Sequence, residues 1–172
     1  MSNRYTQLIP LVSYPGQGLL EAINNIEPST AGKERDLDLR QFIQFISETK
    51  LTELQEKFTQ TFDMNPATCL DLGWHLYGEA YERGAFMVKV RELLRDNKIE
   101  ESSELPDHLS HVLSAIEVLD EADQKVFIEK YVQPAMKKIL KGFGESDNPY
   151  KQAIQFINRI LTKPALDNGG NA

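Results

Sequence analysis

Apolar residues recur at spacings of three and four along most of the chain, as they do on the buried face of an α-helix. Leu51, Leu54, Phe58 and Phe62 show this spacing most simply. Five further segments repeat it, with apolar positions at Leu37, Leu39, Phe42, Ile43 and Ile46; Phe86, Val90, Leu93 and Leu94; Leu109, Val112, Leu113, Ile116 and Leu119; Val132, Met136, Ile139 and Leu140; and Ala153, Ile154, Ile157 and Leu161. Because each stripe must be covered by another helix to leave water, the pattern predicts several helices around one core.

Polar and proline residues mark where these helices should begin. Asn65-Pro66 and Asn148-Pro149 each combine a capping side chain with a proline suited to the first helical position. Pro106-Asp107 is predicted to open another helix, with the aspartate in the first turn, where a negative charge meets the positive end of the helix dipole. Asp120 is predicted to cap a helix over about 121–143.

Proline and glycine also predict where helices are interrupted or end. Pro134 lies inside the helix predicted after Asp120, so a kink or a break is expected there. Gly142 or Gly144 can end that helix. Only residues 7–14 have the character of a strand, and Pro10 argues against one because proline lacks the N–H that a β-ladder needs.

The chain shows no internal repeat and no linker that would divide it. Loops are predicted at about 27–35, 97–105 and 144–148. The predicted fold class is therefore all-α, a single-domain bundle of about eight to nine helices over residues 1–164. Residues 165–172 are predicted to be a flexible C-terminal tail because the end of the chain has no apolar anchor.

Composition excludes several classes of function. The 172 residues carry a formal net charge of −7 and a pI of about 5.0, which argues against binding to nucleic acid or anionic membrane. The longest basic cluster, Lys137, Lys138 and Lys141, is interpreted as a solvated helix end. One cysteine, Cys69, rules out an internal disulfide and multi-cysteine metal sites. With no signal peptide and no run of eighteen apolar residues, the predicted location is the cytoplasm.

Residues that often carry catalysis occur here in unpromising settings. His108 and His111 lie three apart, and a metal site would need His75 or Glu104 as a third ligand. The plainer interpretation is that His108 borders an apolar stripe while His111 points into solvent. Cys69 is interpreted as a small buried hydrophobe. Because no phosphate-binding loop, dinucleotide fingerprint or nucleophile set is present, we predict a protein that is not an enzyme and has no cofactor of its own.

A binding function remains, and one part of the chain has the composition of a groove wall. Helical bundles bind partners in grooves lined by aromatic side chains and a few polar groups. Such side chains gather in two nearby segments of the sequence. They are Trp74, His75, Tyr77, Tyr81 and Arg83, followed by Glu104 to His108. The alternative is that these aromatic residues belong to the core or its edge, although Tyr and Trp usually keep a polar end near water.

The same segments resemble a known family. Ser13-Tyr14-Pro15 is similar to an "SYP" element, and 61–66 to a "TFDxxP" segment. Residues 75–84 are similar to "HLxGDxxxRG". Residues 104–113 are similar to "ELPDHLPxVLE", the most specific of these motifs. Two later elements, "LxPAL" and "SPY", resemble Val132-Gln133-Pro134-Ala135 and Asn148-Pro149-Tyr150. In this order they resemble the assembly chaperones of membrane-bound respiratory nitrate reductase, called NarJ or the delta subunit, within the TorD-like family of redox-enzyme maturation proteins.

The resemblance implies a cytoplasmic, all-helical chaperone for unfolded protein. Members of the family bind the N-terminal segment of a catalytic subunit that carries a molybdenum cofactor, and they hold that subunit until the cofactor is inserted and it docks at the membrane. The implied client is the alpha subunit of respiratory nitrate reductase. The acid–histidine pair of the family's peptide-binding element corresponds to Asp107 and His108, with Glu104 and Pro106 in the same element.

From the groove-wall composition and the resemblance together, we expect nine residues to bind the client peptide: Trp74, His75, Tyr77, Tyr81, Arg83, Glu104, Pro106, Asp107 and His108. Asp107 is expected to pair with a client lysine or arginine, and His108 to exchange a hydrogen bond. Departures such as Ser110, where the nitrate-reductase group often has proline, leave another molybdenum enzyme of the same reductase superfamily as an alternative client. A metal- or nucleotide-handling maturation factor and a scaffold that assembles as a helical oligomer are rival hypotheses. A monomer is favoured.

Overall fold

The computed structural model describes residues 3–32 and 34–163, and these form ten α-helices and three helical segments of other types. The bounds in chain order are η1 Thr6–Val12, α1 Leu19–Asn24, α2 Pro28–Ala31, α3 Leu37–Ser47, α4 Leu51–Phe58, η2 Thr59–Asp63, α5 Leu72–Tyr77, α6 Tyr81–Asp96, α7 Leu109–Val118, α8 Glu121–Phe127, η3 Ile128–Val132, α9 Gln133–Phe143 and α10 Pro149–Thr162. Segment η1 is a 3-10 helix, whereas η2 and η3 are π-helices. The predicted all-α class is confirmed. The tail predicted at 165–172 lies outside the described residues.

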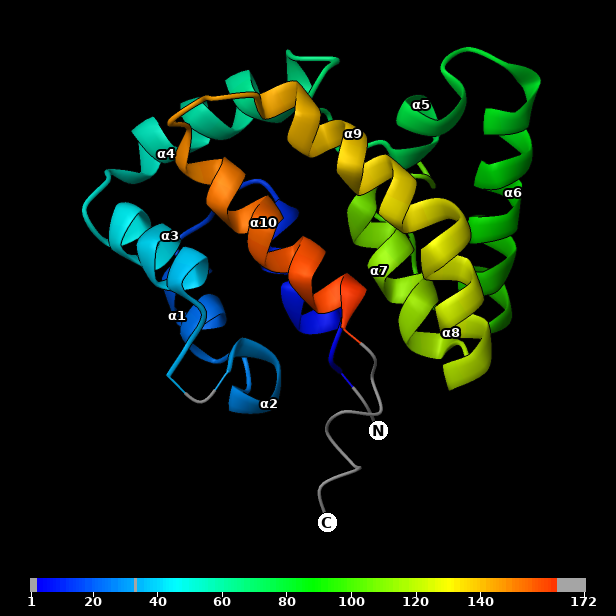
Figure 1. The fold of residues 1–172 in the computed structure, drawn as a ribbon, viewed down its shortest axis with the longest axis horizontal. Coiled ribbons are helices and arrows are strands. Elements are labelled where there is room, and N and C mark those ends of the chain that lie inside the picture. Colours follow the sequence, from blue (N-terminus) through cyan, green and yellow to red (C-terminus); the bar gives the residue numbers. More distant parts are fainter. Residues whose placement is uncertain (1–2, 33, 164–172) are drawn as a thin grey trace.

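Helix α10 occupies the middle of the bundle. It packs against α3 on one side and α9 on the other, and Figure 1 shows it crossing the molecule between these two helices. Seven of its side chains are buried: Tyr150, Ala153, Ile154, Phe156, Ile157, Ile160 and Leu161. Side chains at this spacing cover more than one face of a helix, which is why α10 is surrounded by neighbours.

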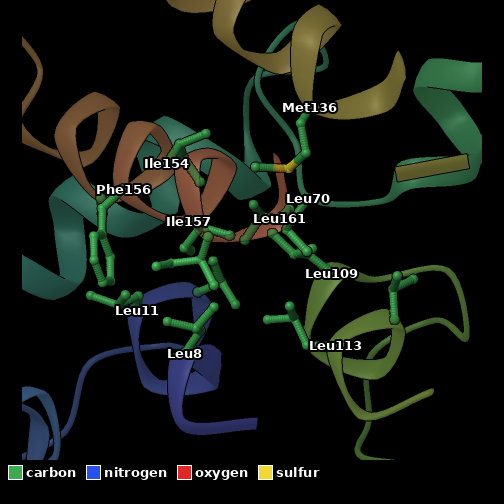
Figure 2. Packing of buried hydrophobic residues seen from close by; sticks show 14 of the residues in the cluster. Leu8, Leu11, Leu70, Leu109, Leu113, Met136, Ile154, Phe156, Ile157 and Leu161 are labelled. Carbon is green, nitrogen blue, oxygen red and sulfur yellow. The ribbon is translucent and has the colours of Figure 1, made fainter. Parts of the chain in front are cut away.

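The buried apolar side chains form a single cluster around α10. Figure 2 shows Leu8 and Leu11 of η1, Leu109 and Leu113 of α7, and Met136 of α9 converging on Ile157 and Leu161. Fully burying one such side chain contributes roughly 1.5–3 kcal/mol. None of the helices formed by the described residues has the length and apolar character needed to cross a bilayer.

The segment predicted as a possible strand at 7–14 is not one, as Pro10 indicated, because Thr6–Val12 form the 3-10 helix η1. At the start of this helix, the backbone N–H groups donate hydrogen bonds to a residue far along the sequence. A single carboxylate oxygen of Glu117, on α7, accepts hydrogen bonds from the N–H groups of Tyr5 and Thr6 at 2.8 and 3.1 Å. This cap joins the start of the chain to α7, and Leu8 can then be buried against that helix.

The helix starts at Asp120 and Asn148 are confirmed, and each side chain accepts a backbone N–H in the first turn. The start predicted at Asn65-Pro66 is wrong, because Asn65 closes a turn onto the N–H of Ala67 and α5 begins only at Leu72. The start predicted at Pro106 is also wrong, because α7 begins at Leu109 with His108 as its cap.

One tertiary contact sets where α5 and α7 begin. The N–H of Leu72 donates to the carbonyl of Asp107 at 2.9 Å, and the N–H of Leu109 donates to the carbonyl of Leu70 at 2.8 Å. These bonds make an antiparallel bridge between Asp71 and His108, which is the only β pairing in the described part of the chain. The paired residues Asp71 and His108 are therefore extended, and α5 and α7 begin directly after them.

Pro134 perturbs its helix without ending it. Segment η3 widens to a π-turn just before α9, and Pro134 then occupies the first turn of α9. A π-turn accommodates the missing N–H and the bulk of the proline ring, so the predicted irregularity is confirmed in this form. Gly144 ends α9 with a φ of 57°, a left-handed conformation that glycine adopts at little cost.

Candidate functional site

An open groove runs between α5 and α9. Its volume is about 550 Å³, and Trp74, Leu76 and Tyr77 of α5 line one wall while Lys138 and Lys141 of α9 line the other. Trp74 and Tyr77 are half-buried, so part of each aromatic ring faces the groove. The indole N–H of Trp74 donates to the carbonyl of Pro66 at 3.1 Å, which fixes the ring over the preceding loop.

Two hydrogen bonds hold the short helix α5 in place. Lys138 Nζ donates to the carbonyl of His75 at 2.8 Å and so ties α9 to α5. His75 Nε2 lies 2.7 Å from the carbonyl of Cys69, to which it donates. Burial lowers the pKa of His75, in keeping with a neutral ring that serves as a structural donor. Cys69 is half-buried rather than fully buried, with its sulfur 3.6 Å from the same ring nitrogen.

Gly142 allows α9 to lie directly on the loop that forms the floor of this groove. A Cβ on Gly142 would overlap the carbonyl of Ala67. We therefore expect Gly142→Ala to lower the free energy of unfolding by about 1–3 kcal/mol, because overpacking forces the backbone apart. Urea titration would measure this loss. Gly84→Ala is the matched control, since no atom lies within 4 Å of its Cβ, and it should stabilise α6 by about 0.5–1 kcal/mol.

Beside the groove, a buried ion pair joins α6 to the segment before α7. Arg83 Nε donates to Asp107 Oδ2 at 2.9 Å, and the Asp107 side chain is 0% exposed. The other oxygen of Asp107 is buried without a hydrogen-bond partner. The arginine also approaches Asp71 at 3.6 Å. A Cβ at Gly73 would come within 2.5 Å of Asp107 Oδ2, so the glycine gives the pair its space.

Asp71 experiences this crowding most strongly. Burial raises the pKa of Asp71 to about 6, and the charge of Asp107 raises it as well, whereas Arg83 acts in the opposite direction. Glu104 and Asp63 also add negative charge near it. Among the described residues, Asp71 and Asp107 share one arginine, Arg83. The surface next to the groove is therefore acidic and favours a basic partner.

His108 has a structural task at the start of α7. Its Nδ1 accepts a hydrogen bond from the N–H of Ser110 at 3.1 Å, so the ring caps the helix. Burial, helped by the nearby His111, lowers the pKa of His108 to about 4, so the ring is neutral near pH 7. Glu104 lies 3.9 Å from its other nitrogen, Nε2, and is half-exposed.

His111 contradicts the prediction that it points into solvent. It is 4% exposed, its Nδ1 donates to the carbonyl of Leu105 at 2.8 Å, and its Nε2 accepts from the N–H of Ser102 at 3.0 Å. The loop 97–105 folds over the ring, and sequence periodicity cannot show this. In the described residues, no three His, Cys, Asp or Glu side chains come together as a metal-binding group.

A second hollow, of about 340 Å³, lies between η1 and the start of α7. Tyr14, Glu104 and His108 line it together with several serines. Tyr14 is 59% exposed and its ring makes an edge contact with Phe58. Most of the residues that line this hollow are polar. Among them, the half-exposed Glu104 lies next to the N-terminal segment of the chain.

The structure divides the nine predicted residues among neighbouring places. Trp74, His75 and Tyr77 line the α5–α9 groove, whereas Glu104 and His108 line the η1–α7 hollow. The remaining four lie in neither of these two spaces. Pro106 is buried, Arg83 and Asp107 form the ion pair, and Tyr81 is 88% exposed at the start of α6. A fully buried Asp107 that already binds Arg83 does not meet a partner's cation directly, so that expectation is corrected: the cation it pairs with belongs to its own chain.

The prediction missed four residues that shape the site. Asp71, Gly73, Lys138 and Gly142 hold or bound the ion pair and the groove. Asp71 directly precedes α5 and Gly73 is its second residue, and no sequence pattern marked either of them for a tight packing contact. No sequence pattern links Lys138 to His75, because the contact spans 63 residues and depends on how α9 crosses α5.

The geometry defines an all-α protein whose surface carries an aromatic groove beside an acidic cluster, which is an arrangement suited to binding a polypeptide. The family model of the nitrate reductase delta subunit matches residues 31–153. The chain therefore belongs to the nitrate reductase delta subunit family.

A solved structure has the same fold. It is the crystal structure of a candidate redox enzyme maturation protein from Archaeoglobus fulgidus, and it superposes with a TM-score of 0.61 over 95% of each chain at 20% identity. At this identity the likeness concerns the fold. No curated protein matches the chain significantly.

Proposed function

We propose that this protein is an assembly chaperone for a molybdenum-containing reductase, namely respiratory nitrate reductase. It binds the N-terminal segment of the catalytic alpha subunit in the cytoplasm and holds that subunit for cofactor insertion before it docks at the membrane. Membership of the delta subunit family supports the client, and the TorD-like fold is consistent with it. The observation that carries the proposal is the α5–α9 groove, in which Trp74 and Tyr77 remain half-exposed beside an acidic cluster.

The groove and the cluster fit different parts of a client segment. Apolar client residues would pack against Trp74 and Tyr77, which offer broad contact at a small cost in side-chain entropy. A lysine or arginine of the client would face Asp71 and Glu104 rather than the buried Asp107. The exposed ring of Tyr81 extends this surface past the end of α5. The role of the other predicted residues is structural: they hold the segment before α7 against α5, and they are Arg83, Pro106 and Asp107.

The proposal assigns the chain no covalent chemistry. Its histidines cap helices or donate to backbone carbonyls, and its carboxylates form an acidic surface. The work of the protein is then differential binding: the client segment is retained while the groove is occupied and is released when the subunit matures. Specificity comes from matching apolar and basic residues at the right spacing.

We expect Trp74→Ala to weaken binding of the client peptide by roughly 30-fold, or about 2 kcal/mol, because aromatic anchors dominate such interfaces. The probe is a synthetic peptide of the first residues of the alpha subunit, about 15 long and so about four helical turns. Isothermal titration calorimetry gives the affinity. Tyr14→Ala is the matched control, since Tyr14 is an exposed aromatic residue that lines the η1–α7 hollow. Loss of binding in the Tyr14 variant alone would move the site to that hollow.

Purification from the native host distinguishes the rival functions. The proposal expects the alpha subunit of nitrate reductase to co-purify and to be identified by mass spectrometry. Recovery of a different molybdenum enzyme would keep the chaperone function and change the client. Stoichiometric metal or nucleotide on the purified protein, without any bound subunit, would favour a metal- or nucleotide-handling maturation factor instead.

A further inference from the structure

A further hollow, which shares no lining residue with the α5–α9 groove, has no role in the proposed client site. It measures about 420 Å³ and lies between α6 on one side and α8 with η3 on the other. Its floor is apolar, formed by Leu93, Leu119, Phe127 and Tyr131. Phe86 of α6 stacks near Phe127 and Tyr131, with ring centroids 6.2 and 4.9 Å away, so the two walls meet at the base.

The charges around this hollow are sorted by sign. Helix α6 carries Lys89 seven residues before Asp96, whereas the opposite wall carries Asp123 seven residues before Lys130. The two walls run antiparallel, as Figure 1 shows for α6 and α8, so lysine lies beside lysine and acid beside acid. Both ammonium groups approach the ring of Tyr131, at 5.9 and 5.1 Å from its centroid. Seven residues of helix separate the basic end from the acidic end by about 10 Å.

These charges are not paired with one another across the hollow. Glu92, which also lines it, lies between Lys89 and Asp96 along α6. Within the described residues, the one ion pair made by any of these five side chains joins Asp96 to Arg95 at 3.8 Å, with both groups about 70% exposed. If the charges along one wall stood in the opposite order, lysine would face acid across the hollow and the charges would pair within the chain. The sorted arrangement instead leaves a basic end and an acidic end open to a partner.

Apolar side chains also remain exposed along this face. Val126 of α8 lines the hollow and is 62% exposed, and Val88 of α6 is 55% exposed. A ridge next to a hollow is the form that two helical surfaces need for mutual packing. The apolar floor therefore requires a partner with an apolar ridge, an acidic end and a basic end, set in the opposite order.

We propose that the partner is a second copy of this chain, docked about a two-fold axis across the α6–α8 hollow. A two-fold axis that lies in the interface and runs perpendicular to α6 and α8 reverses the order of the charges along the hollow, so the lysines of each copy face the acids of the other. The same rotation places the Val126 ridge of each copy against the hollow of its mate. The hollow is thus complementary to itself, and any interface at it makes both sets of charge pairs at once. This dimer is independent of the client groove, because the two spaces share no lining residue.

Charge reversal tests the proposal directly. Lys89→Glu with Lys130→Glu makes the hollow wholly acidic, and Glu92→Lys with Asp96→Lys makes its acidic end predominantly basic. All four side chains are exposed, and lysine suits the C-terminal end of α6, so both variants should fold. The wild type is expected to dimerise reversibly, and each variant alone should dissociate at least tenfold more readily. An equimolar mixture of the two variants should regain the dimer as a heterodimer.

Sedimentation equilibrium on the full chain, over micromolar concentrations and at low and high salt, measures the association. Circular dichroism checks the folding of each variant, and client-peptide affinity should stay at the wild-type value in both. A wild type that is monomeric at every concentration would overturn the proposal. So would a dimer that survives in both variants, or a mixture that fails to associate. Val126→Asp provides a second test, because two carboxylates facing apolar surface should abolish the dimer without any reversal of the lysines.

Discussion

Replacing Asp107 with asparagine is expected to lower the free energy of unfolding by about 3 kcal/mol, the loss seen when one partner of a buried ion pair is removed. Asp107 is fully buried and Arg83 is only 20% exposed, so water solvates poorly the guanidinium that the substitution leaves without its partner. Asparagine has nearly the same shape, so the change creates little cavity. Chemical denaturation at neutral pH would measure the loss as a shift in midpoint at an unchanged slope.

Two controls separate the buried pair from charge loss in general. Glu101→Gln removes the partner of Arg91 in a surface pair, and stability should hardly change because that pair is solvated. Combining Asp107→Asn with Arg83→Met should recover part of the loss, because no charge is then left buried alone. Equal effects of Asp107→Asn and Glu101→Gln would show that the Arg83–Asp107 pair does not form as described.

Asp71→Asn is expected to have the opposite sign and to stabilise the protein by about 2–3 kcal/mol above pH 7. The reason is that the pKa of Asp71 is raised to about 6 by burial and by Asp107, so its ionised form is held at a cost in the folded state. The same substitution should weaken binding of a basic client peptide, because it removes a charge from the acidic surface. A gain in stability together with a loss of binding is expected of a residue kept for function.

The pH dependence follows from the sign of this shift. Between about pH 4 and 6, folded Asp71 binds more protons than the unfolded chain does, so its contribution to stability falls as pH rises and the cost is full above about 6. His108, with a pKa lowered to about 4, works in the opposite direction: its contribution is lost as pH falls from about 6.5 towards 4. The two effects partly cancel in the wild type.

The comparison of wild type with Asp71→Asn removes that cancellation. The advantage of the variant should be largest at pH 7.5 and should shrink steadily below pH 6, as the wild-type carboxyl becomes protonated. Thermal denaturation of both proteins at a series of pH values would measure it. A difference that stays constant across this range would contradict the raised pKa of Asp71.

Local sequence was sufficient for much of the helical framework. The three- and four-residue spacing in α10 predicted a helix, and its cap at Asn148 and the stop at Gly144 before it depend on neighbouring residues only. The cap predicted at Asp120 was confirmed for the same reason. The motifs also resembled the family that the chain belongs to, because residues 104–113 and the elements around them keep their order.

Local sequence does not predict the conformation of segments whose backbone forms hydrogen bonds with residues far along the chain. Asn65-Pro66 and Pro106 have strong starting signals, yet these segments form turns, and α5 and α7 begin only after the bridge between Asp71 and His108. His111 is buried because a loop closes over it, and the loop's position depends on hydrogen bonds from Ser102 and to Leu105. A helical period identifies a face of a helix, but it does not tell what covers that face.

Most of the helices and the motifs that carry the resemblance can be predicted from the chain alone, because they depend on the intrinsic preferences of residues a few positions apart. Which side chains form the site depends on tertiary packing. Arg83 meets Asp107 and Lys138 meets the carbonyl of His75 across 24 and 63 residues of chain. Burial then decides their chemistry: the same carboxylate that would be a solvated helix charge in a first turn is an internal ion pair at Asp107, because the packing of α5 and α6 excludes water from it.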